Sequence, residues 1–174
     1  MVDAATNWAF TVGWATTKGM PERMAQQVFR TAADALWWQD AGGVDQLGKN
    51  LARVRPDLDV HELSKLTRAG MRSYMRYWCE AFRLPKLTTE QINDRFELRG
   101  VELLDQAMDS GSGALMIPGH MANWDVGGAW AAARYGRLTT VVEQLKPEKL
   151  YDQFLEYRES LGMEALPLGN PDVM

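Results

Sequence analysis

The stretch GALMIPGHMANWD, residues 113–125, decides the fold of this chain. Its first part, residues 114–117, is a continuous apolar run between a glycine and a Pro-Gly pair, which predicts a short strand covered on both faces. Asn123 and Asp125 stand where a helix N-terminus is expected, ahead of the Ala-rich segment 126–135. We therefore expect a buried strand, a turn and then a helix.

His120 lies in this turn and is one of only two histidines in the chain. Residues five apart on one continuous helix point about 140° away from each other, so His120 and Asp125 can cooperate only where the backbone changes direction. A strand-turn-helix provides that change, at the sheet edge where open α/β proteins usually bind ligands. A neutral imidazole there could take a proton from a hydroxyl while the carboxylate fixes its tautomer. His120 and Asp125 are therefore the predicted catalytic residues.

Composition excludes several classes of protein. A chain of 174 residues fits one domain with a sizeable core, and its net charge of -4 argues against a nucleic-acid partner held by phosphate contacts. The single cysteine, Cys79, excludes an internal disulfide framework, and together with two distant histidines it argues against a structural zinc site. No apolar run reaches the roughly 20 residues that span a bilayer, and the N-terminus lacks the pattern of a secretory signal. We predict neither a metal nor a cofactor.

The first half of the chain has helical patterns. Residues 3–17 favour a helix, either packed in the core or anchored at a membrane interface, although their aromatic residues also alternate as in a strand. A clearer helix begins at Pro21 and ends near Trp37-Trp38, and we expect it to bury one face: Met24, Val28, Ala32, Ala35 and Leu36. A short helix over residues 47–54 follows.

Residues 57–84 carry the strongest helical pattern. One face is apolar: Met71, Tyr74, Met75, Trp78, Cys79 and Phe82. Beside it runs a stripe of five cations, which we call the basic stripe: Lys65, Arg68, Arg72, Arg76 and Arg83. The stripe is either a solvated face or a contact for anionic lipid head groups or a phosphate. We expect His61 at the surface and Cys79 as an inert core thiol.

The second half alternates helices and strands. We expect a short helix from residue 88 with a strand-like 96–98 after it, a helix over 101–108, strands over 138–142 and 165–168, and a helix over 147–161 between those strands. With the strand at 114–117, this order implies a parallel sheet with right-handed crossovers. The predicted class is α/β, with a helical N-terminal layer packed on a small, mostly parallel sheet with flanking helices. We expect one domain over residues 1–174, with a helical part over 1–85 and an α/β part over 86–174.

The segment HMANWD, residues 120–125, resembles the HxxNW(D/E) form of the HxxxxD motif. That form belongs to the lipid A (late) acyltransferases and the related phosphatidylinositol mannoside acyltransferases. Further stretches resemble the mannoside branch: YW at 77–78, FRLP at 82–85, VEQLKPE at 142–148, YRESLG at 157–162 and LPL at 166–168. The family often has Ser-Gly where this chain has Met121-Ala122. Relatives continue well beyond the length of this chain, which resembles the N-terminal portion of an acyltransferase. The resemblance therefore implies an incomplete glycerolipid-acyltransferase-like fold.

The resemblance implies transfer of a fatty acyl group from acyl-CoA, or an acyl carrier protein, to a mannose hydroxyl of a phosphatidylinositol mannoside. His120 would be the general base and Asp125 would orient it. The implied substrate-binding residues are Arg158, which matches a family position near the active site, and Glu143, Asn123 and Trp124. Acyl-CoA is then a substrate and no cofactor is needed. For Trp124, Trp130, Met116 and Met121, lining an acyl groove and packing in the core are equally open.

The resemblance also implies where the protein works. Its partners would be acyl-CoA, a membrane glycolipid acceptor and the membrane surface, with no nucleic acid. Its place would be the cytoplasmic face of the bacterial plasma membrane, as a peripheral protein. Two alternatives stay open: acylation of lipid A or a lysophospholipid, and a non-catalytic membrane-binding module that uses the aromatic N-terminal part and the basic stripe.

Overall fold

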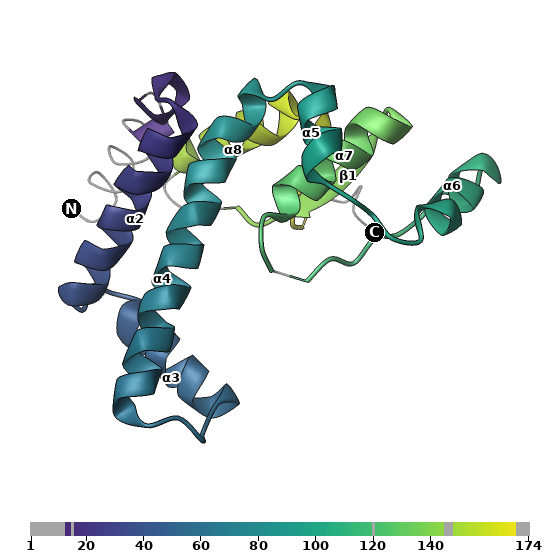
Figure 1. Cartoon of the computed structure of the whole chain (residues 1–174). Coiled ribbons are helices and arrows are strands. Elements are labelled where there is room, and N and C mark those ends of the chain that lie inside the picture. The colour runs from purple at the N-terminus through teal and green to yellow at the C-terminus, as the bar shows by residue number, and fades with distance from the viewer. Residues whose placement is uncertain (1–12, 15, 120, 145–147, 170–174) are drawn as a thin grey trace. The chain divides into compact units, whose positions relative to one another are not determined.

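The computed structural model describes residues 13–14, 16–119, 121–144 and 148–169, and the chain divides into two compact units. One unit is Trp14–Arg83 and is helical, whereas the other contains the chain from Leu84 onward and holds the sheet (Figure 1). The boundary falls between Arg83 and Leu84, two residues before the expected division between residues 85 and 86. Most of the predicted first helix, residues 3–17, lies outside the described residues; residues 13–14 and 16–19 are helical.

The helical unit is built from α2 (Glu22–Trp38), α3 (Val44–Val54) and α4 (Val60–Arg83). The helices α2 and α4 run side by side, and α3 packs near the N-terminal end of α4 (Figure 1). Ala33, Val44 and Met71 form a small core that joins all three helices. The three predicted helices are thus confirmed, with α3 beginning three residues earlier than expected.

The buried face of α2 differs from the predicted face. Met24 and Val28 are 52% and 47% exposed, whereas Ala25 and Ala33 are fully buried. The reason is that alanines at the contact let α2 lie close against α4, so the larger side chains of the neighbouring face turn outward. The predicted face was therefore wrong: the observed buried face is displaced around the helix by about one residue position.

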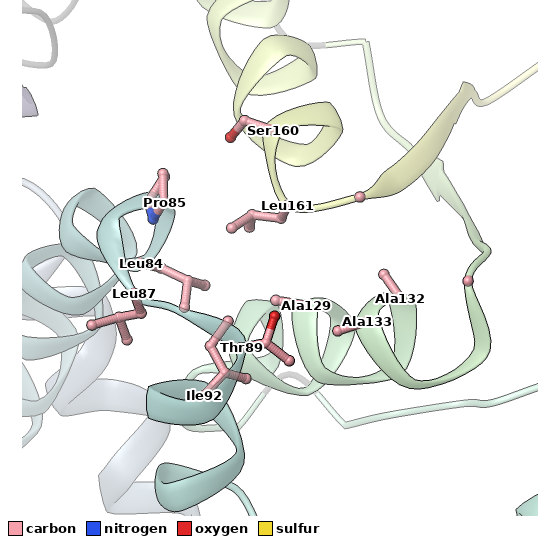
Figure 2. A pocket seen from close by; sticks show the side chains of 12 residues that line it. Leu84, Pro85, Leu87, Thr89, Ile92, Ala129, Ala132, Ala133, Ser160 and Leu161 are labelled. Carbon is pink, nitrogen blue, oxygen red and sulfur yellow. The ribbon is translucent and has the colours of Figure 1, made fainter.

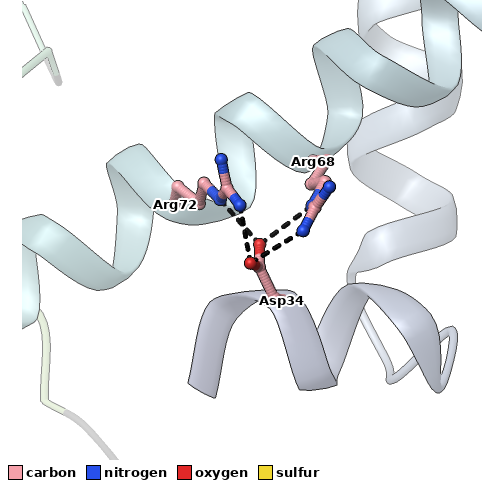
Figure 3. Close-up of polar contacts among 3 residues, drawn as sticks. All are labelled: Asp34, Arg68 and Arg72. Atoms are coloured by element: carbon pink, nitrogen blue, oxygen red, sulfur yellow. Dashed lines mark hydrogen bonds and ion pairs between the residues drawn. The ribbon is translucent and has the colours of Figure 1, made fainter. Parts of the chain in front are cut away.

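Most of the arginines in the basic stripe form polar contacts within this unit. Asp34 of α2 accepts hydrogen bonds from Nε and Nη2 of both Arg68 and Arg72, at 2.6–3.0 Å (Figure 3). The hydrogen bonds from Arg72, and then those from Arg68, hold the pKa of the Asp34 carboxyl well below its ordinary value. Arg83 donates to the carbonyl oxygens of Thr17 and Met20. These arginines stabilise the pairing of helices within the unit.

The second unit contains helices and a sheet. Its helices are η1 (Leu84–Lys86), α5 (Thr89–Arg95), α6 (Val101–Asp109), α7 (Trp124–Tyr135) and α8 (Glu148–Ser160). The strands β1 (Leu138–Val142) and β2 (Met163–Pro167) pair in parallel, with Leu138 opposite Met163 and Val142 opposite Pro167. Since α8 lies between the two strands in sequence, it is the crossover that a parallel pair requires.

The core of this unit lies between α5, α7 and β2. It is formed by buried side chains: Leu84, Ile92, Ala129, Trp130, Ala131 and Met163. A Cβ on Gly128 would lie 2.5 Å from Cε of Met163, so the glycine leaves room for the end of the Met163 side chain against α7. Asp105 of α6 accepts hydrogen bonds from Arg134 and from the Tyr135 hydroxyl, which ties α6 to α7.

The predicted strand at 114–117 is wrong. Residues 113–119 are irregular, and Leu115 and Ile117 are 89% and 86% exposed. A buried strand needs a hydrogen-bonding neighbour and cover on both faces, and β1 and β2 pair only with each other among the described residues. Residues 96–98 likewise lie outside any strand. The α/β class and the parallel pairing are confirmed, with two strands in the described part of the chain.

No helix among the described residues combines the length and the apolar character that crossing a bilayer demands.

Candidate active site

The backbone bends sharply just before α7. The Met121 N–H donates to the Gly119 carbonyl at 2.8 Å, and Ala122 has a left-handed conformation with φ of 54°. Asn123 then takes the N-cap position, although its side chain does not cap the helix. The backbone therefore turns ahead of Asp125, but it does not come out of the strand that was expected over residues 114–117. His120, the predicted base, lies outside the described residues.

Asp125 is buried in the first turn of α7, with 1% of its surface exposed. Nε of Arg158, from the last turn of α8, lies 3.9 Å from its Oδ1 oxygen. The two side chains therefore form an ion pair, but Nε and Oδ1 are too far apart for a hydrogen bond. A buried carboxylate needs a compensating charge, and both Arg158 and the positive end of the α7 dipole supply it.

Trp124 also contacts Arg158. The guanidinium carbon of Arg158 is 4.7 Å from the centroid of the Trp124 ring, a cation–π geometry. The start of α7 and the end of α8 thus bring together three predicted site residues. The residue before Arg158 in the chain, Tyr157, is also buried.

Glu143 is not part of this arrangement. It is exposed, directly follows β1, and no contact described for it reaches Asp125 or Arg158. In the other unit, Cys79 is 1% exposed, and burial raises the pKa of its thiol, as an inert core residue requires. Among the described residues, no three or more His, Cys, Asp or Glu side chains are grouped as metal ligands would be.

A pocket of about 230 Å³ opens between η1, α5, α7 and the end of α8. Its lining is both apolar and polar: Leu84, Ile92 and Leu161 face one another across it, and Thr89 and Ser160 also line it (Figure 2). Trp124, Asp125 and Arg158 do not line it. The pocket is therefore separate from the cluster around Asp125.

The four residues proposed for either an acyl groove or the core have different surroundings. Trp130 is buried and packs on Phe96 with ring centroids 5.1 Å apart, so it belongs to the core. Met116 and Met121 are 41% and 79% exposed. Trp124 contacts Arg158 as described above.

Sequence reasoning missed the stacking of Arg158 on Trp124 and the left-handed backbone of Ala122. Nothing in a single sequence links two helix ends that are distant along the chain. For Ala122 the resemblance offered a signal, because the Ser-Gly form of the motif quoted above puts glycine at this position and glycine is the residue that tolerates positive φ.

Comparison with known proteins identifies the family. The model for the bacterial lipid A biosynthesis acyltransferases matches residues 1–171. A phosphatidylinositol mannoside acyltransferase of Mycolicibacterium smegmatis is 46% identical over 165 residues, which cover 94% of this chain and 53% of that protein. One from Mycobacterium tuberculosis H37Rv is 42% identical over 166 residues, which cover 94% of this chain and 52% of that protein. The chain spans about half the length of these relatives. With nearly every residue matched, the chain belongs to the bacterial lipid A biosynthesis acyltransferase family.

Proposed function

We propose that this chain is the motif-bearing part of an acyltransferase that moves a fatty acyl group from acyl-CoA to a mannose hydroxyl of a phosphatidylinositol mannoside. The observation that carries the proposal is identity of 46% across 94% of the chain to a protein named for this acceptor. The motif residues His120 and Asp125 lie within the matched length, and Asp125 is buried beside Arg158.

In the proposed reaction, His120 takes the proton of the mannose hydroxyl as its oxygen attacks the thioester carbonyl carbon. The tetrahedral intermediate collapses with cleavage of the C–S bond, and the CoA sulfur leaves with the proton returned by the imidazolium. The products are the sugar ester and free CoA, without a covalent enzyme intermediate. Asp125 orients the imidazole, and backbone N–H groups at the start of α7, near Asn123, help hold the developing oxyanion.

The remaining predicted residues complete the proposal. Arg158, Glu143, Asn123 and Trp124 contact the substrates or hold the groups that do. The acceptor is a membrane lipid, so we place the protein at the cytoplasmic face of the bacterial plasma membrane as a peripheral protein, with the membrane surface as its partner.

His120→Ala in the longest natural form of the protein tests the base. We expect transfer of a labelled acyl group from acyl-CoA to phosphatidylinositol mannoside to fall about 10³-fold or more, with the circular dichroism spectrum unchanged. The matched control is His61→Ala, since His61 is the other histidine and is exposed on α4. That variant should transfer at the wild-type rate. Near-normal turnover of His120→Ala would refute the assignment.

A second acceptor is favoured by the family match, because the family is described by lipid A biosynthesis. Assaying phosphatidylinositol mannoside and a lipid A precursor against one acyl-CoA separates the two. We expect the mannoside to be preferred. Vesicle binding with no transfer to either acceptor would support the non-catalytic membrane-binding module instead.

A further inference from the structure

Arg158 is held by two neighbours of different kind. Its Nε lies 3.9 Å from Oδ1 of Asp125, and its guanidinium carbon lies 4.7 Å from the centroid of the Trp124 ring. The Nε atom is buried and has no hydrogen-bond partner among the described residues. Attraction between two charges at this distance is not directional, so the ion pair by itself does not fix how the guanidinium is turned.

The ring supplies the missing constraint. Trp124 and Asp125 are consecutive residues of the first turn of α7, so their side chains leave the helix about 100° apart. Arg158 reaches both from the last turn of α8, with only 16% of its side chain exposed. A guanidinium over an aromatic face at this distance has a preferred placement, and burial strengthens the attraction.

The alternative role for Trp124 is to line a groove for the acyl chain. The pocket of about 230 Å³ described above is lined without Trp124, whereas the contact of the ring with Arg158 is direct. We propose that Trp124 is a positioning residue, whose ring holds the Arg158 guanidinium beside Asp125 and thereby fixes the carboxylate that orients the base. The inference rests on the proposed function for the role of Asp125, and on the described geometry for the contact between Trp124 and Arg158.

Replacing the ring tests the inference through kinetics. In the longest natural form of the protein, Trp124→Leu should lower kcat about tenfold, with KM for acyl-CoA and for the mannoside acceptor unchanged within about twofold. Trp124→Phe keeps an aromatic face for the guanidinium and should restore kcat to within about threefold of wild type. Loss of a groove residue would instead raise KM and leave kcat high, and that result would overturn the proposal.

A matched control removes an indole elsewhere. Trp38, at the end of α2 in the other unit, is 80% exposed, so Trp38→Leu should leave kcat and both KM values unchanged. Thermal unfolding of each variant identifies a variant that fails to fold. If Trp124→Leu fails to fold, Trp124→Phe and the spectroscopic measurement described next decide whether the proposal holds.

Nuclear magnetic resonance tests the contact without any assay of activity. In protein labelled with [¹⁵N]arginine, the Hε proton of Arg158, assigned by its loss in Arg158→Lys, should be shifted upfield by the indole ring. Trp124→Phe should keep part of that shift and Trp124→Leu should abolish it. An unshifted wild-type resonance would refute the stacking even if the enzyme is active. Failure of the wild type to transfer acyl groups would refute the proposed function, and the resonance would still decide whether the ring holds Arg158.

Discussion

At the scale of single residues, Ala122 and Asp125 show how the backbone prepares the motif. Ala122 has φ of 54°, in the left-handed region, and α7 begins two residues later with Trp124 and Asp125. A residue with a Cβ is strained in this region, and strain of this kind is typical of functional sites. The bend gives Asp125 its buried position in the first helical turn.

We predict that Ala122→Gly stabilises the protein. Glycine removes the strain of a Cβ at positive φ, which is worth about 1–2 kcal/mol, and loses part of that gain through its greater freedom in the unfolded chain. The expected net gain in the free energy of unfolding is about 0.5–1 kcal/mol, measured by urea denaturation.

The control for this change is Ala133→Gly. Ala133 is an exposed residue inside α7, where glycine should lower the stability by about 1 kcal/mol. If both substitutions destabilise the protein equally, the left-handed strain at Ala122 is not relieved by glycine and the prediction is wrong.

At the scale of elements, the pairing of α2 with α4 depends on two features that act together. Ala25 and Ala33 are small enough to let the helix axes approach, and Asp34 then reaches both Arg68 and Arg72 across the contact. The ring of Trp37 lies under the Arg68 guanidinium, 5.2 Å from its carbon. Packing and charge therefore select the same orientation of α2.

We predict that this contact makes stability depend on pH. The folded-state pKa of Asp34 is lowered by the hydrogen bonds from Arg72 and Arg68, so the folded protein binds the proton less readily than the unfolded chain. The stabilisation is fully present above the ordinary pKa of 3.8 and is lost as the pH falls below that value. Asp34→Asn should therefore be less stable than wild type at neutral pH, and the difference should shrink at pH values below the ordinary pKa.

Urea unfolding of both proteins across the acidic range measures this difference. Asp45→Asn is the control, since Asp45 forms an exposed pair with Lys49 on α3, with side chains 64% and 61% exposed. Its substitution should change stability little at any pH. A gap between wild type and Asp34→Asn that stays constant down to strongly acidic pH would contradict the prediction.

At the scale of the whole molecule, the distribution of charge bears on the proposed attachment to a membrane. The chain has a net charge of -4, and four of the five cations in the basic stripe bond within their own unit: Arg68 and Arg72 to Asp34, Arg76 to Glu80 and Arg83 to backbone carbonyls. A free stripe would add about 1 kcal/mol per cation near an anionic surface. The internal bonds favour the interpretation that the stripe stabilises the helical unit.

We therefore predict that attachment to vesicles depends little on anionic lipid. Binding to phosphatidylcholine vesicles should change less than about twofold when phosphatidylinositol is added or when salt is raised. Arg68→Gln combined with Arg72→Gln should lower the unfolding temperature without weakening attachment. Co-sedimentation with vesicles measures the binding of the wild type and of the double variant. Binding that rises steeply with phosphatidylinositol and is lost in high salt would show that the basic stripe contacts the membrane.

Much of the fold could be predicted from the sequence, because local signals decide it. Periodicity and terminal residues located α2, α3, α4 and α7, and the strand expected over residues 138–142 matched β1 at both ends. The motif, together with the further stretches that resemble the family, predicted the acyltransferase family, and the family match confirms that membership. The chemistry of the motif stays a prediction. These features depend on residues within a few positions of one another.

What only the tertiary structure decided are the contacts between distant segments. The apolar pattern of residues 114–117 does not tell whether a neighbouring strand is there to pair with them, and in the described structure these residues are exposed. Which face of α2 is buried depends on how closely α4 approaches, and the meeting of Arg158 with Trp124 and Asp125 depends on where α8 ends against α7. The sequence by itself determined the helices, the parallel strand pair and the motif, since these follow from local backbone preference and periodicity. The burial of Asp125 beside its cation was decided in three dimensions, because the energy of a buried charge depends on everything packed around it.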